Sequence, residues 1–280
     1  MRRAVLVLLP LALLPACRSD EVPLSYRLEP GLRLEHRLTL RAEVTRTLSG
    51  ETREQEVEAS FRATQELLGP LEGGGAQAAI SLVPEGLEVD SRSVDIGPSQ
   101  EYTVQLGPDG RVVAVQVAAG EGTEALEPVG IERLLPRLRP VLPGRPVGPG
   151  DSWRSDTDFT DDQGRFSLTT RSRLAQLGVI EGRDAALVRT TYESPVDRQE
   201  VFANAVADVT GSDVGAQEAW FALDGYLVRA VGDSVGTYRV TFTPPGIEEG
   251  LAPVRGSLVV RLHLEMQLLS AAGSAASASP

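Results

Sequence analysis

The chain has 280 residues and a formal net charge of −12, and all 27 of its basic side chains are arginines. An acidic chain with no cluster of basic residues lacks the electrostatic footprint of a nucleic-acid-binding protein, so we expect no nucleic-acid partner. Two histidines and one cysteine are too few for a zinc site of the usual kind. The chain also holds no phosphate-binding loop or dinucleotide fingerprint, so we expect neither a metal nor a cofactor.

Residues 1–16 are predicted to be a secretory signal peptide. Two arginines near the start are followed by an apolar run over residues 4–16, which is typical of a signal peptide. The run is shorter than the about 20 residues that a membrane-spanning helix needs. Cys17, the only cysteine of the chain, comes directly after it.

The stretch LPAC, residues 14–17, resembles the lipobox of bacterial lipoproteins. The resemblance implies cleavage before Cys17, acylation of that cysteine, and a membrane as partner. One acyl chain binds a membrane only reversibly, whereas three chains anchor a protein stably. Arg18 stands where an aspartate would retain such a protein in the inner membrane, so the resemblance implies the outer membrane of the cell envelope, facing the periplasm. Residues 17–25 would then be the lipidated N-terminus and its tether.

Residues 26–123 are predicted to form a first β lobe. Apolar and polar side chains alternate over residues 32–45 and again over residues 57–67, which indicates strands with one buried face and one wet face. Turn residues between the two runs predict a long antiparallel hairpin. Further strands follow, and the pair Asp109-Gly110 predicts a tight turn with positive φ.

Residues 124–149 are predicted to hold one short helix and a linker rich in proline and glycine. Four apolar side chains recur at the spacing of one helical face, namely Ile131, Leu134, Leu135 and Leu138. Pro136 and Pro140 limit this helix to a short or kinked one, because proline lacks the amide hydrogen and clashes with the preceding turn.

Residues 150–269 are predicted to form a second β lobe. Its strands, its turns and the pair Asp224-Gly225 follow the order of the first lobe, which indicates either two related lobes or two unrelated groups of hairpins. The last strand alternates as far as Leu268, and the small, polar residues 270–280 are predicted to be a disordered tail. The fold class is therefore mainly β with antiparallel sheets, as a curved sheet, a half-barrel or a sandwich in each lobe.

This layout resembles an uncharacterised family of β-rich cell-envelope lipoproteins of bacteria. The shared features are a strand after Gly31, a proline-rich passage over residues 143–153 that ends in Gly-Asp-Ser-Trp, and the later Asp224-Gly225 turn. The resemblance covers most of the chain after the signal peptide and implies no known activity.

The stretch GDSVG, residues 232–236, matches the G-x-S-x-G pattern of serine hydrolases, with Ser234 as the nucleophile. That motif needs a strand, a sharp turn and then a helix, but the residues after it are strand-like. The candidate base, His263, lies on the polar side of the final strand, and no acid is clearly placed. We therefore predict no catalytic residue and interpret the motif as a hairpin turn.

The acidic stretch over residues 156–164 does not fit an EF-hand calcium loop. With Asp156 as the first ligand, the conserved loop positions for a glycine and a glutamate fall on Asp161 and Ser167. A loose surface site for Ca²⁺ and a plain acidic turn are the two remaining interpretations, and the turn is favoured.

His36 falls on the apolar face of the strand over residues 32–45. It is either a ligand-binding or proton-handling group in a cavity, or a neutral core histidine that bonds to a neighbour. Both interpretations remain open, and His36 is the candidate ligand-binding residue of the chain.

Three functions are compatible with these features. The preferred hypothesis is a lipid-anchored, non-enzymatic module of the cell envelope with a structural or interaction role and an unknown protein partner. The alternative is a carrier that binds a hydrophobic ligand or a lipoprotein in a curved β cavity. A third, weaker hypothesis is a hydrolase that uses Ser234. An apolar cavity beside His36 would favour the carrier, and a solid core would favour the structural module.

Overall fold

The computed structural model describes most of the chain after the predicted signal peptide. It describes residues 21–95, 98–119, 126, 131–161, 164–202, 205–243 and 253–273. The signal peptide at 1–16, Cys17 with its lipobox, and residues 274–280 of the predicted tail lie outside the described residues.

Twelve strands and one short helical segment make up the described part of the chain. The strands are β1 (Arg33–Leu48), β2 (Glu51–Pro70), β3 (Ala76–Val89), β4 (Arg92–Ser93), β5 (Gln100–Leu106), β6 (Val112–Ala119), β7 (Ser152–Asp161), β8 (Gly164–Ile180), β9 (Arg183–Phe202), β10 (Ala205–Ala222), β11 (Tyr226–Thr243) and β12 (Val254–Ala272). The helical segment consists of α1 (Ile131–Leu134) and the 3₁₀ helix η2 (Leu135–Arg137).

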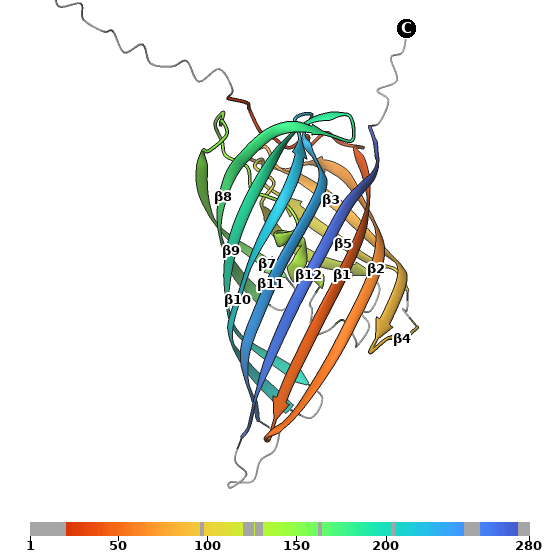
Figure 1. The fold of residues 1–280 in the computed structure, drawn as a ribbon, viewed down its shortest axis with the longest axis vertical. Helices are drawn as coiled ribbons and strands as arrows, with labels where there is room; N and C mark the ends of the chain where they lie inside the picture. Colours follow the sequence, from red (N-terminus) through yellow and green to blue (C-terminus); the bar gives the residue numbers. More distant parts are fainter. Residues whose placement is uncertain are drawn as a thin grey trace, which may run out of the picture.

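The strands form one sheet that closes on itself. They are paired in the order β2-β1-β12-β11-β10-β9-β8-β7-β6-β5-β3-β4, and β2 also pairs with β3. Within the described residues, every strand except the two-residue β4 therefore belongs to one closed barrel (Figure 1). All neighbouring strands are antiparallel apart from β6 and β7, which are parallel and pair where Ala114 lies opposite Thr160.

The prediction of a mainly β, antiparallel fold is confirmed, but the expected pair of separate lobes is replaced by one barrel. Strands from residues 26–123 and 150–269 meet at both junctions, because β6 pairs with β7 and β1 pairs with β12. The pairing of β1 with β12 extends from Arg33 opposite Ala272 to Leu48 opposite Gly256. Neither half is left with an open apolar face that a second layer would have to cover.

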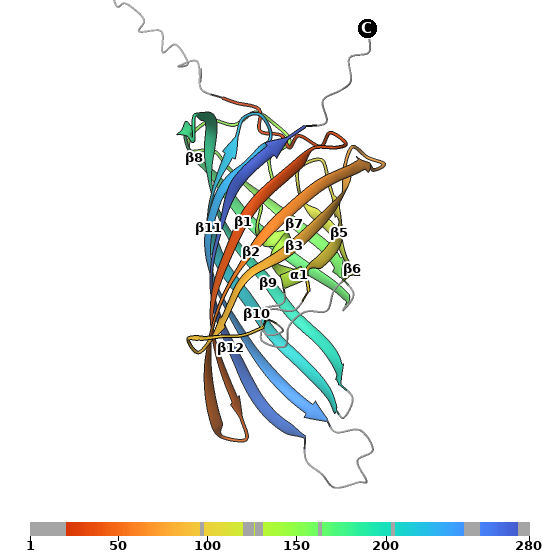
Figure 2. The same ribbon diagram turned by 90° about the vertical axis from the view of Figure 1, so that its right-hand side faces the viewer.

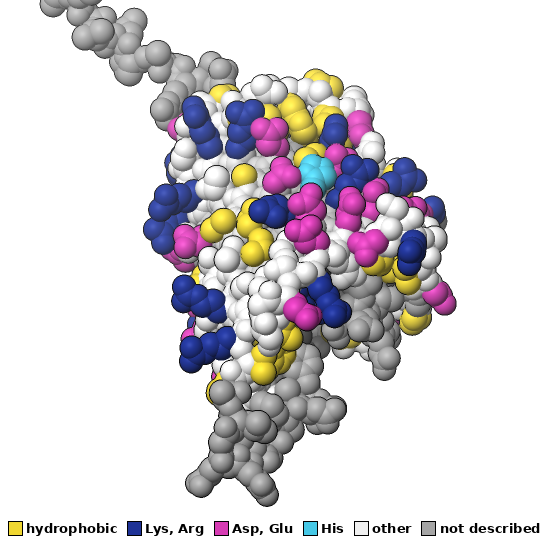
Figure 3. Space-filling view, turned by 60° about the horizontal axis from the view of Figure 1, so that its bottom comes forward, with side chains coloured by type: hydrophobic (Ala, Val, Ile, Leu, Met, Phe, Trp, Pro, Cys, Tyr) yellow, Lys and Arg dark blue, Asp and Glu magenta, His cyan; other side chains and the backbone are white. Residues whose placement is uncertain are grey.

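Alternation along the strands directs the apolar side chains into the barrel. In β1, for example, Leu38 and Leu40 are buried while Arg37 and Arg41 are exposed. The side of the molecule seen in Figure 3 carries acidic and basic side chains interspersed with scattered apolar ones. No helix of the described residues has both the length and the apolar character needed to cross a membrane.

A segment that we call the plug, residues 131–142, runs through the interior of the barrel. Figure 2 shows α1 between the wall that contains β1, β2 and β3 and the opposite wall. Leu134, Leu135 and Leu138 are buried in the same apolar cluster as the inner face of β1. The predicted short helix is thus present in the form of α1 and η2, with Pro136 inside the 3₁₀ turn.

The chain that precedes β1 covers one end of the barrel. We call residues 21–31 the strap. Val22 pairs with Val147 just after the plug, and the amide of Arg27 donates to the carbonyl of Gly225 at 2.8 Å. Leu24 is only 4% exposed, so the described part of the predicted tether is packed against the barrel rather than free. At the other end of the chain, β12 extends to Ala272, further than the predicted start of the tail.

Candidate ligand cavity

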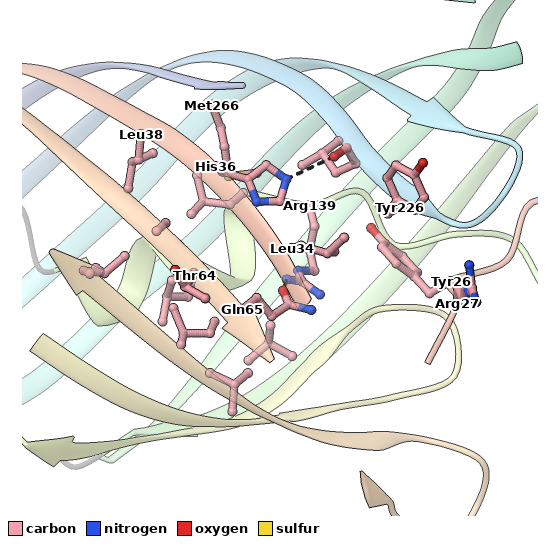
Figure 4. A pocket seen from close by; sticks show the side chains of 18 of the residues that line it. Tyr26, Arg27, Leu34, His36, Leu38, Thr64, Gln65, Arg139, Tyr226 and Met266 are labelled. Carbon is pink, nitrogen blue, oxygen red and sulfur yellow. Dashed lines mark hydrogen bonds between the residues drawn. The ribbon is translucent and has the colours of Figure 1, made fainter. Parts of the chain in front are cut away.

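A cavity of about 50 Å³ lies inside the barrel, at the end that the strap covers (Figure 4). Its wall is mostly apolar and comes from β1, β2, β3, β5, β6, β11 and β12, together with the plug and the strap. The apolar lining residues are Leu28, Leu34, Leu38, Ala63, Ile80, Leu82, Val104, Val112, Leu135, Leu138, Leu227 and Met266. The polar lining includes Tyr26, Arg27, His36, Thr64, Gln65, Arg139 and Tyr226.

His36 lies in this lining because it occupies an inward-facing position of β1 between Leu34 and Leu38. Its side chain is 6% exposed, and Nε2 lies 3.1 Å from the carbonyl oxygen of Leu227. Burial lowers the pKa of His36 to about 4; the hydrogen bond to Leu227 opposes this shift and the charge of Arg139 adds to it. His36 is therefore neutral at pH 7, where Nε2–H donates to the carbonyl and Nδ1 is left as an acceptor.

Arg139 brings a cation to the cavity from the plug. Its Nη2 donates to the amide oxygen of Gln65, and its guanidinium carbon lies 5.7 Å from the centre of the Tyr26 ring. No carboxylate of the described residues forms an ion pair with it. Burial lowers the pKa of Arg139, and the neighbouring Tyr26 partly offsets this effect. The hydroxyl of Tyr26 donates to the carbonyl of Pro140 at 2.8 Å, which fixes the strap to the plug.

A second polar group fixes the plug to the opposite wall. Arg137 Nη2 lies 2.7 Å from Asp213 Oδ2 of β10, and the two side chains are only 10% and 8% exposed. The hydroxyl of Tyr238 donates to Asp213 Oδ1, and the guanidinium of Arg137 lies 5.5 Å from the centre of the Tyr192 ring. Burial works to lower the pKa of Arg137, but the charge of Asp213 and the neighbouring tyrosines outweigh it and raise that pKa. The guanidinium of Arg137 therefore stays charged although it is buried.

The residues of the G-x-S-x-G motif do not form a hydrolase site. The motif lies within β11 and not in a hairpin turn, so the turn interpretation is wrong. Neighbouring residues of a strand point to opposite faces. Ser234 accordingly faces the interior and is 9% exposed, while Asp233 and His263 lie on the outer face, with Asp233 Oδ1 2.8 Å from His263 Nδ1. The serine and the histidine are separated by the sheet itself.

The motif instead provides small side chains where the plug meets the wall. Gly232 and Ser234 line a cavity of about 20 Å³ together with Leu134, Arg137 and other residues. A Cβ atom on Gly236 would meet the hydroxyl of Tyr238 and Oδ1 of Asp213. Glycine and serine at these inward positions therefore leave room for the Arg137–Asp213 pair.

The acidic stretch over residues 156–164 forms the ends of β7 and β8, apart from residues 162–163, which lie outside the described part. Asp156 accepts hydrogen bonds from Arg154 and Thr169, and Asp158 pairs with Arg165. Among the described residues, no group of three or more histidine, cysteine, aspartate or glutamate side chains is placed to hold a metal ion. Asp156 and Asp158 are thus each engaged with an arginine.

Sequence reasoning selected His36 but missed Arg139, Gln65 and the Arg137–Asp213 pair. Arginines on a short segment between prolines have the pattern of a solvent-exposed helix face. The one available signal was that the same segment holds a full apolar helical face, which has to be buried against something.

Comparisons with known proteins identify no family. No protein-family model matches the chain, and the comparison with curated protein sequences finds no match. Among solved structures, the chain is similar to one described as "Lipid-protein interactions in lipovitellin", with a TM-score of 0.47 and 13% sequence identity. The match covers 91% of this chain and 27% of that one, so the chain spans about a quarter of the protein it matches.

Proposed function

We propose that the protein is a non-enzymatic carrier that binds a hydrophobic ligand inside its barrel. The observation that supports this proposal is the cavity beside His36, because its lining is mostly apolar and reaches the strap-covered end of the barrel. A buried apolar surface with a few convergent polar groups is the usual form of a small-molecule site.

The size of the cavity limits how a ligand can fit. A cavity of about 150 Å³ can hold one benzene molecule, whereas this one is about 50 Å³. The plug leucines Leu135 and Leu138 form part of its wall. A longer apolar chain would therefore take the space of these side chains, and binding would shift the plug away from that part of the lining.

A fluorescent apolar probe tests the carrier proposal. The neutral dye N-phenyl-1-naphthylamine should brighten on binding the purified protein, and lipid should be extractable from protein purified from cells. Absence of both signals would contradict the carrier and favour the structural module, for which the filled interior of the barrel is the supporting observation.

Filling the cavity should weaken binding of the probe. Ala63 lines the cavity from β2, and Ala63→Leu adds three carbon atoms to a space of about 50 Å³. We expect the affinity for the dye to fall by about tenfold, since an overpacked site loses 1–3 kcal/mol or more. Ala216→Leu adds the same atoms at an exposed position of β10 and should leave the affinity unchanged. Equal affinity in the two variants would place the dye elsewhere.

We also propose that Cys17 is acylated and anchors the protein to the outer membrane, facing the periplasm. The lipobox and the apolar run before it support this proposal. Cys17→Ser should abolish incorporation of radiolabelled palmitate and release the protein from the membrane fraction, because the acyl chains supply the membrane affinity. Labelling that persists in Cys17→Ser would contradict the anchor.

A further inference from the structure

We propose that the ligand is a single-chain amphiphile whose carboxylate head pairs with Arg139. This inference rests on the proposed carrier function and names the chemical class of its ligand.

The first argument is the charge balance of the cavity. Arg139 and Arg27 are the arginines of the lining. Arg27 already pairs with Glu29 at 2.6 Å, and its side chain is 42% exposed. Arg139 has the amide oxygen of Gln65 as its acceptor and forms no ion pair with a carboxylate of the described residues. Arg139 is partly buried, and a charge withdrawn from water is costly unless it is paired, so an anion in the cavity would relieve this cost.

The second argument is the geometry of the donors. A guanidinium presents five N–H groups in a planar fork that matches the two oxygens of a carboxylate. Gln65 takes a hydrogen bond from one terminal nitrogen, and Figure 4 shows the Arg139 and Gln65 side chains meeting within the group of lining residues. His36 is neutral at pH 7 and therefore offers no competing cation.

The third argument is the position of the cavity relative to the proposed anchor. The lining includes Tyr26, Arg27 and Leu28 of the strap, and the exposed side chain of Arg27 shows that the lining extends to the surface there. Cys17 is four residues before the first described residue, Glu21. Four residues span at most about 14 Å, so an acylated Cys17 would hold this end of the barrel close to the lipid surface. Amphiphiles that leave a membrane would meet the cavity first.

Displacement of N-phenyl-1-naphthylamine by decanoate and by decanol tests the inference at neutral pH. The two competitors share the same chain, and only decanoate carries a charge. We expect the wild-type protein to bind decanoate 10- to 100-fold more tightly than decanol, which is the usual gain from a charge-assisted hydrogen-bonded pair. Arg139→Met should bring the affinity for decanoate down to that for decanol, and Arg139→Lys should keep part of the preference.

The outcomes separate the two proposals. Failure of the dye and of both competitors to bind would contradict the carrier function itself. Equal affinity for decanoate and decanol, or an unchanged preference in Arg139→Met, would contradict the pairing of a carboxylate head with Arg139. Either result would leave the proposed carrier function standing. Acetate serves as the control that has a carboxylate but no long chain. If acetate displaced the dye as effectively as decanoate does, the proposal of an amphiphilic ligand would be wrong. A circular dichroism spectrum of Arg139→Met that matches the wild type shows that this variant is folded.

Discussion

Asp213→Ala is expected to lower the free energy of unfolding by about 3–5 kcal/mol. The substitution leaves the guanidinium of Arg137 inside the barrel without its carboxylate partner, and both side chains of the pair are nearly inaccessible to solvent. Tyr238 loses the acceptor of its hydroxyl at the same time. Urea-induced unfolding of the purified protein, followed by circular dichroism, measures the change.

The matched control removes both charges. Arg137→Met combined with Asp213→Leu replaces the pair with apolar side chains of similar size, and such replacements are often neutral or stabilising. We therefore expect the double variant to be markedly more stable than Asp213→Ala. If Asp213→Ala costs less than about 1 kcal/mol, the typical value for an exposed pair, the ion pair is not buried in solution.

The buried face of most strands could be predicted from the sequence, but the closure of the sheet into a barrel could not. Alternation between Leu38, Leu40 and their polar neighbours identifies one buried face because the side-chain period of a strand is two. The same pattern is compatible with a sandwich, a half-barrel and a barrel, since it does not say which strand pairs with which. The pairing of β1 with β12 joins residues more than 200 positions apart, and no local feature of either strand specifies it.

For the plug, likewise, the helix could be predicted from the sequence but its position inside the barrel could not. The spacing of Leu134, Leu135 and Leu138 predicts a short helix with one apolar face, and that part of the prediction agrees with α1 and η2. Whether such a face packs on the outside of a sheet or inside a barrel depends on the closure of the sheet. The roles of Arg137 and Arg139 follow from the second alternative, because only an enclosed segment places these cations among apolar side chains.

Lowering the pH from 7.5 to 5 is expected to destabilise the fold through His36 by about 2 kcal/mol. The pKa of His36 falls from its usual 6.5 to about 4 on folding, chiefly because the ring is buried. As the pH falls, the unfolded chain therefore takes up this proton before the folded protein does. The stability that the neutral ring contributes is fully present above pH 6.5 and is lost progressively as the pH falls toward 4.

His36→Gln isolates this contribution, since glutamine can donate to the carbonyl of Leu227 but does not titrate. The carboxylates of the protein also titrate over this range, but they are common to both proteins and cancel in the comparison. We expect unfolding in urea at pH 7.5 and pH 5 to show a loss of stability that is about 2 kcal/mol smaller in His36→Gln than in the wild type.

His263→Gln is the matched control on the outer face. Its hydrogen bond to Asp233 raises the pKa of His263, so this histidine contributes stability at low pH that is lost as the pH rises through its folded pKa. His263→Gln should therefore change the pH dependence of the free energy of unfolding in the opposite direction to His36→Gln. The change should be small, since the ring of His263 is exposed to solvent. A pH dependence that is the same in His36→Gln and the wild type would mean that the histidine ring is hydrated, and the cavity beside it would then be open to water.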